Sequence, residues 1–110
     1  MDISGEKVDK GVVVSVTGRM DAVTSPDFEK EMDRWIEDGE ILFVVDLKSL
    51  DYISSSGLRS ILSIAKKLKA RKGKILLASL KNVVKEVFEI SGFSTIIPLY
   101  ESLDTAMSDL

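Results

Sequence analysis

One junction in this chain, Ile53-Ser54-Ser55-Ser56-Gly57-Leu58-Arg59, carries an apolar strand-like segment directly into an amphipathic helix. Free backbone N–H groups and the positive end of the helix dipole meet at a helix N-terminus, so a phosphate is favourable beside these serines. The chain contains no His and no Cys, which leaves it without the imidazole or thiol of a Ser-His-Asp or Cys-His site. We therefore expect these hydroxyls to be acted upon rather than to serve as the catalytic nucleophiles of an enzyme.

A serine at a helix start is also an ordinary N-cap, because its hydroxyl accepts a hydrogen bond from a free backbone N–H. One serine here needs no function, whereas three in succession followed by a glycine exceed what capping requires. From the physics of the residues alone, a plain cap and a functional phosphate or hydroxyl site both remain open.

Strand and helix patterns alternate on both sides of this junction. The pattern predicts strands at residues 3–8, 12–17, 41–47, 74–79 and 95–97, and helices at 25–38, 55–71, 82–91 and 102–110. Short connections and right-handed crossovers then give an α/β fold: a mixed, mostly parallel five-stranded sheet with an N-terminal antiparallel hairpin, flanked by about four helices.

Several local signals set the expected helix ends and buried faces. Ser25 is predicted as an N-cap followed by Pro26 at the first helical position, and Asn82 as the cap of a later helix. The apolar spacing predicts two inward stripes: Leu58, Ile61, Leu62, Ala65 and Leu68 in the longest helix, and Val83, Val84, Val87 and Phe88 in the helix after Asn82.

Polar residues follow several of the predicted strands. The loop Gly18–Asp21, Asp46, the serine run and Ser79 all lie near strand C-termini. Functional residues of such sheets gather at that edge, so we expect these residues to share one end of the molecule.

The composition is that of one soluble domain spanning residues 1–110, with 45% hydrophobic and 30% charged residues. A net charge of −3 argues against nucleic-acid binding as the main function, and no apolar run reaches the length of a membrane span. Without cysteines or a secretory segment, we expect a cytoplasmic protein that does not insert into a membrane.

Other kinds of site fit the sequence less well. The serine run lacks the glycine of a nucleophile elbow, and Gly73-Lys74 is followed by Ile75, so it does not make a phosphate-binding loop. Asp21, Asp46 and Asp51 would suit a divalent cation, but solvated loop acids are the commoner arrangement. The basic run 66–72 is typical of a helix C-terminus, where cations offset the dipole.

The chain resembles a STAS domain of the anti-sigma factor antagonist type over nearly all of Ile3–Leu110. Four segments carry the resemblance: Gly18-Arg19-Met20-Asp21, Val44-Val45-Asp46-Leu47, Tyr52-Ile53-Ser54-Ser55-Ser56-Gly57-Leu58, and Ile75-Leu76-Leu77-Ala78-Ser79 before Asn82. The serine-glycine signature is the most specific of the four.

The resemblance implies that a partner kinase phosphorylates Ser55, which lies two residues before Gly57. Ser54 stands where the family often has Asp, so Ser54 and Ser56 are rival acceptors. Asp21 matches an aspartate that the family places near the phosphosite. The implied partner-binding surface consists of Met20, Asp21, Ser54, Ser56, Gly57 and Arg59.

The implied function is that of a switch rather than an enzyme. In its unmodified form the protein would bind an anti-sigma factor that is itself a serine kinase, and so release a sigma factor to RNA polymerase. Mg-ATP would belong to the kinase, with no cofactor or metal on this chain, and a serine phosphatase would reset the switch. The alternative is a STAS adaptor subunit of a membrane transporter or other signalling complex, which is not phosphorylated.

Overall fold

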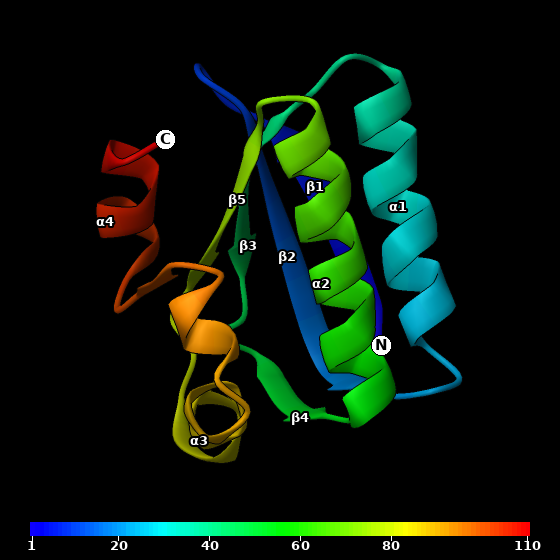
Figure 1. Ribbon diagram of the computed structural model, residues 1–110, viewed down its shortest axis with the longest axis vertical. Helices are drawn as coiled ribbons and strands as arrows, with labels where there is room; N and C mark the ends of the chain where they lie inside the picture. The colour runs from blue at the N-terminus through cyan, green and yellow to red at the C-terminus, as the bar shows by residue number, and fades with distance from the viewer.

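A computed structural model describes all of residues 1–110. Its elements, in chain order, are β1 Asp2–Lys7, β2 Val12–Met20, α1 Ser25–Glu37, β3 Leu42–Asp46, β4 Leu50–Ile53, α2 Ser55–Ala70, β5 Lys74–Ala78, α3 Asn82–Ile90, the 3-10 turn η1 Phe93–Thr95, β6 Leu99–Tyr100 and α4 Leu103–Ser108 (Figure 1). None of these helices is both long and apolar enough to span a bilayer.

The sheet has strand order β1-β2-β3-β5-β6, with β4 paired to the far end of β2. The β1–β2 pair is an antiparallel hairpin, and every other pairing is parallel. This confirms the predicted mixed sheet with its N-terminal hairpin and flanking helices.

Helices cover both faces of the sheet, because β3 and β5 are apolar on both sides. Phe43 and Val45 join the main core beneath α1 and α2, whereas Val44 packs with Ala78 and with Ala106 of α4 on the opposite face. Figure 1 shows α1 and α2 side by side over the hairpin, with α4 at the other edge of the molecule. The continuous apolar run 41–47 is the sequence signal of such a strand.

The sheet contains six strands rather than the five predicted, because β4 was missed. Residues 18–20, predicted as loop, continue β2 so that Met20 pairs with Ile53 of β4. β2 changes partner between Ser15, which pairs with Asp46 of β3, and Gly18, which pairs with Leu50 of β4. The β4 pairing then shifts register between Gly18 and Arg19, and Gly18 takes a positive φ of 96°. Only glycine adopts that backbone conformation without a steric cost.

The last strand is also displaced from its predicted position at 95–97. Residues Phe93–Thr95 form η1, and the strand is Leu99–Tyr100, after Pro98. Pro98 has no N–H to donate, but its carbonyl accepts a hydrogen bond from Leu77 N at 3.0 Å. Ile97 is buried in the core by the turn rather than by a strand.

Two helices differ from expectation at their N-termini. Thr24, not Ser25, is the N-cap of α1, and Ser25 lies inside the helix with its hydroxyl donating to the Asp21 carbonyl. Lys81, not Asn82, is the N-cap of α3. In both cases the polar residue predicted as the N-cap is the first residue of the helix, and the N-cap lies one position earlier. Such boundaries are weakly determined by sequence.

The buried faces are each rotated slightly from the predicted stripes. In α2 the predicted residues Ile61 and Leu68 are fully buried together with Ile64, which was not predicted, while Leu62 and Ala65 are only half-buried. In α3 Val84 and Phe88 are buried and Val87 packs half-buried against the core, whereas Val83 is 59% exposed. Leu62 and Ala65 face an open groove instead of a closed interface.

Candidate partner-binding site

The C-terminal ends of β2 and β4 bring two distant segments of the chain together. Met20 pairs with Ile53 in the parallel register, and the Met20 carbonyl accepts a hydrogen bond from Ser54 N at 2.9 Å. The residues that follow each strand, Asp21 and the serine run, therefore lie beside one another. This part of the predicted shared end is confirmed.

The three serines occupy three different environments. Ser54 is the N-cap of α2, and its hydroxyl accepts a hydrogen bond from Gly57 N at 3.2 Å. The Ser56 hydroxyl accepts one from Arg59 Nη2 at 3.3 Å, and this residue is half-buried. Ser55 is the first residue of α2 and is exposed, and its hydroxyl is engaged in neither contact. It is the serine whose hydroxyl is most open to another protein.

Gly57 has a packing role. A Cβ on this residue would lie 2.7 Å from Ile53 Cγ1 and 2.9 Å from the Met20 carbonyl oxygen. Such distances are shorter than van der Waals contact, so only glycine lets the first turn of α2 rest on the ends of β2 and β4. This close contact fixes the position of Ser55 relative to the ends of β2 and β4.

The partner surface expected from sequence needs a correction at two residues. Met20 is fully buried, and Gly57 is buried beneath the first turn of α2. Neither presents a side chain at the surface, because both fill the contact between α2 and the strand ends. The accessible part of the expected surface is Asp21, the serine run and Arg59.

Asp21 organises the loop that leads into α1. Its Oδ1 accepts hydrogen bonds from Val23 N at 3.0 Å and from the backbone N–H and hydroxyl of Thr24 at 3.1 and 3.2 Å. These bonds, chiefly the one from the Thr24 backbone, hold the pKa of the Asp21 carboxyl below its ordinary value. A fixed negative charge therefore stands beside the serine run at neutral pH.

Three residues at this end were missed by the sequence analysis. Tyr52 of β4 is 37% exposed, and its ring lies beneath the Arg19 guanidinium at 4.2 Å. Val23, in the loop after Asp21, is 82% exposed. Aromatic and arginine side chains are enriched in protein interfaces. The exposed side chains of 50–53 are predictable only once β4 is recognised as a strand.

A polar hollow of about 380 Å³ lies between α1 and α2 next to Ser56. Ser60 is buried at its base and donates to Glu29 Oε2 at 2.9 Å. Arg59 stands at its edge. The hollow extends the accessible surface from the serine run along the seam between the two helices.

Asp46 and Ser79 do not join this cluster, and Asp51 is exposed on β4. Asp46 Oδ1 accepts from Lys48 N at 3.1 Å and so shapes the turn into β4, while Ser79 N donates to the Tyr100 carbonyl beyond β5. Figure 1 places the ends of β3 and β5 across β4 from the start of α2. The structure assembles no group of three acidic residues suited to a metal ion.

Comparison with known proteins identifies the family to which this chain belongs. The model of the STAS domain matches residues 3–106. The chain belongs to the STAS domain family. A candidate anti-sigma factor antagonist of Bordetella bronchiseptica, BtrV, is 39% identical over 106 residues, which is 96% of this chain and 91% of that protein.

Solved STAS domain structures agree with the architecture. An anti-sigma factor antagonist from Mycobacterium paratuberculosis superposes with a TM-score of 0.90 at 27% identity, covering 98% of this chain and 92% of that one. The Bacillus cell fate determinant SpoIIAA in its phosphorylated form superposes with a TM-score of 0.77 at 20% identity, covering 98% of each chain. At that identity the second likeness concerns the fold alone.

Proposed function

We propose that this STAS domain is an anti-sigma factor antagonist whose binding to an anti-sigma factor serine kinase is ended by phosphorylation of Ser55. The observation that carries the proposal is that the hydroxyls of the three serines have different contacts. Ser54 caps the helix and Ser56 accepts from Arg59, while the exposed Ser55 hydroxyl stands at the helix N-terminus. The relationship to BtrV, named as a candidate for this function, supports the assignment.

The phosphoryl transfer itself would be performed by the kinase. The Ser55 Oγ attacks the γ-phosphorus of ATP, the bond from that phosphorus to the β,γ-bridging oxygen breaks, and ADP leaves. The hydroxyl proton passes to a base of the kinase, which also holds Mg²⁺. This chain contributes a nucleophile that the first turn of α2 fixes in place, and a phosphatase later returns the serine by hydrolysis.

The fold should tolerate the phosphate. Phosphorylation adds about −1.5 to −2 charges and three acceptor oxygens. At the first position of α2 these oxygens meet free backbone N–H groups and the positive end of the helix dipole. Unfolding is therefore a poor explanation for release of the partner.

Release follows instead from the charge placed within the interface. Phosphoserine would stand beside the Asp21 carboxylate, whose lowered pKa keeps it ionised. Burying both charges against a partner adds a desolvation cost and a repulsion of up to several kcal/mol, on the order of a thousandfold or more in affinity. Arg59 contacts Ser56 in the present state and is exposed, so it is available either to an acidic group of the partner or to the phosphate.

The test begins with partner capture and site mapping. The unmodified chain, used as bait in a lysate of its own organism, is expected to recover a kinase-fold ATPase that adds one phosphate to the tryptic peptide Ser49–Arg59 in the presence of Mg-ATP. Fragmentation should place the phosphate on Ser55. Phosphate on Ser54 or Ser56 would overturn the site, and recovery of transporter subunits would favour the adaptor function.

Variants then separate the switch from stability. Ser55→Ala is expected to bind the kinase and resist phosphorylation. Ser55→Asp should bind weakly while keeping the wild-type melting temperature, because an acidic side chain is favourable at a helix N-terminus. Ser49→Asp, in the exposed turn before β4, adds the same charge outside the proposed surface and is the matched control. If Ser55→Asp loses binding only because it unfolds, the interface explanation is wrong.

A further inference from the structure

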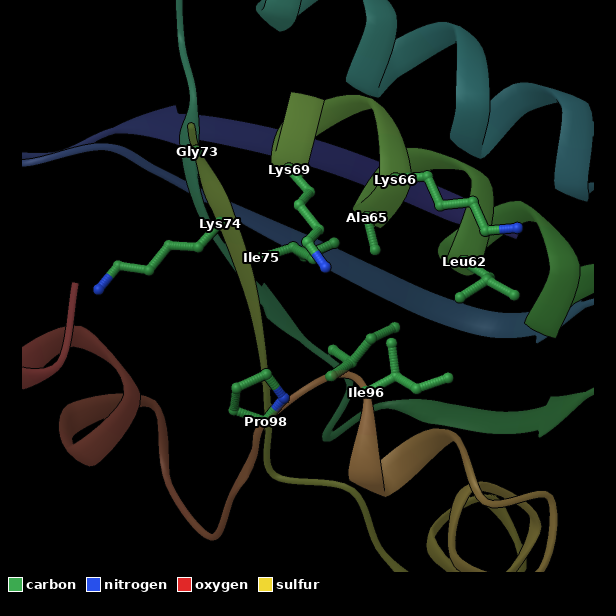
Figure 2. Close-up of a pocket in the computed structure, with 10 residues that line it drawn as sticks. Leu62, Ala65, Lys66, Lys69, Gly73, Lys74, Ile75, Ile96 and Pro98 are labelled. Carbon is green, nitrogen blue, oxygen red and sulfur yellow. The ribbon is translucent and has the colours of Figure 1, made fainter. Parts of the chain in front are cut away.

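A groove of about 450 Å³ lies at the other end of α2, between residues 62–69 of that helix and the segment Ile96–Pro98. Figure 2 shows Leu62 and Ala65 projecting from α2 toward Ile96 and Pro98, with Ile75 of β5 as the floor. We call this hollow the α2 groove. Ile96 is 60% exposed at its rim, an unusual position for a large apolar side chain.

The helix side of the α2 groove is cationic. Lys66 and Lys69 line it and are exposed, and neither belongs to any of the salt bridges of the protein. Lys74 differs, because its ammonium donates to the Asp109 carbonyl and, as Figure 2 shows, extends away from the groove. No Asp or Glu lines the groove.

The positive charge extends well beyond these two lysines. Residues 52–85 contain nine Lys and Arg and no Asp or Glu, in a chain whose net charge is −3. A second hollow, lined by Arg59, Leu62, Ser63, Lys66 and Lys67, continues the groove along α2 toward its start. From Arg59 to Lys69 this cationic surface runs about 15 Å along the helix.

We propose that the α2 groove is a second docking site, which binds an acidic segment of a partner protein through an apolar anchor side chain. The apolar floor and wall would hold the anchor, and Lys66 and Lys69 would meet neighbouring carboxylates. Lys66 lies about 16 Å along α2 from Ser55, so this contact survives when Ser55 carries a phosphate. The inference therefore does not depend on the proposed phosphorylation.

The shape of the groove favours a protein segment over other anions. Nucleic acid has no apolar side chain to fill a floor made of Ile75 and Pro98, and a flat anionic membrane does not enter a concave groove. A small carboxylate would use only one end of the charged surface. A segment alternating acidic and large apolar residues matches both its length and its chemistry.

The test uses nuclear magnetic resonance titration of the full chain with a capped peptide, Glu-Glu-Leu-Glu-Asp-Leu-Phe-Glu-Glu. We expect the amide signals of Leu62, Lys69 and Ile96 to shift, with a Kd of about 1 mM or below. The same peptide with its Leu and Phe replaced by Ser keeps its charge and should bind at least about tenfold more weakly.

Charge variants test the cationic side of the groove. The double variant Lys66→Gln/Lys69→Gln should weaken peptide binding about fivefold, whereas Lys30→Gln/Lys48→Gln, which removes the same charge elsewhere, should change it less than about twofold. If the nuclear magnetic resonance spectrum of the double variant indicates that it is misfolded, the single variant Lys69→Gln is titrated in its place. Ser55→Asp should leave peptide binding unchanged, which separates this result from the test of the phosphorylation switch.

Several results would overturn the proposal. These are no binding at about 5 mM peptide, equal effects of the two double variants, or equal binding of the Ser-substituted peptide. Tighter binding of single-stranded DNA or of phosphatidylglycerol vesicles through the same residues would assign the surface to that class of partner instead.

Discussion

At its first turn α2 rests so closely on the strands that Gly57 leaves no space for a Cβ, whereas from Leu62 onward the same helix borders an open groove. The first end has its backbone and two of its three serines tied by hydrogen bonds. The second end leaves two lysines without ionic partners. The difference suggests that a modification site benefits from a fixed position, while a docking surface benefits from unfilled space and unpaired charge.

The largest expected contrast lies between two apolar residues of α2. Ile64→Ala should lower the free energy of unfolding by about 3 kcal/mol, because Ile64 is fully buried and its truncation leaves a cavity. Leu62→Ala should cost about 1 kcal/mol, because Leu62 already faces the α2 groove. Urea denaturation of both variants measures the difference. Equal losses would mean that the groove is closed in solution.

The next effect concerns the close approach at the first turn. Gly57→Val should lower the free energy of unfolding by about 2 kcal/mol, because its side chain meets the Met20 carbonyl and Ile53. Ala70→Val, at the exposed last turn of α2, should cost less than about 0.7 kcal/mol. If both substitutions cost the same in urea denaturation, the first turn is no more tightly packed than the last.

A smaller effect distinguishes two adjacent serines. Ser54→Ala should cost about 1 kcal/mol of stability, because it removes the hydroxyl that accepts from Gly57 N. Ser55→Ala should change stability by less than about 0.5 kcal/mol, because the exposed Ser55 hydroxyl has no capping role. Thermal unfolding at neutral pH compares the two. A larger loss for Ser55→Ala would reverse their assigned roles.

The smallest expected effect is the pH dependence of the Asp21 loop. The folded-state pKa of Asp21 is lowered by the Thr24 and Val23 hydrogen bonds, so its contribution to stability is present above the ordinary carboxyl pKa of 3.8 and is lost as the pH falls through the lower, folded-state value. Below pH 3.8, Asp21→Asn should therefore lose less melting temperature than the wild type as the solution is acidified. The measurement is the melting temperature of each protein as a function of pH, and an equal fall in melting temperature for the two proteins would contradict this expectation.

Much of the fold was predictable from sequence, because the signals were local and repeated. The β-branched run of β2, the two-sided apolar run of β3 and the long amphipathic α2 each specify their own structure. The juxtaposition of Asp21 with the serine run followed from the general position of strand ends in such sheets.

The features that escaped prediction depend on contacts between distant segments. The strand β4 is only four residues long and becomes a strand because the end of β2 offers it a partner. Ile97 is buried by a turn, and Leu62 is left half-exposed because Ile96–Pro98 stops short of it. The close packing of the buried Met20 against Gly57 is likewise a contact between distant segments, and the periodicity of neither segment predicts it.

Between Ser15 and Gly18, β2 leaves β3 and continues with β4. The connection at residues 47–49 is held at both ends, because Leu47 is fully buried and the Ser49 carbonyl accepts a hydrogen bond from Gly18 N at 2.9 Å. A change in the length of this connection would therefore displace β4, which leads to the serines, and would also disturb the core around Leu47, so that the position of the serines and the stability of the fold depend on the same few residues.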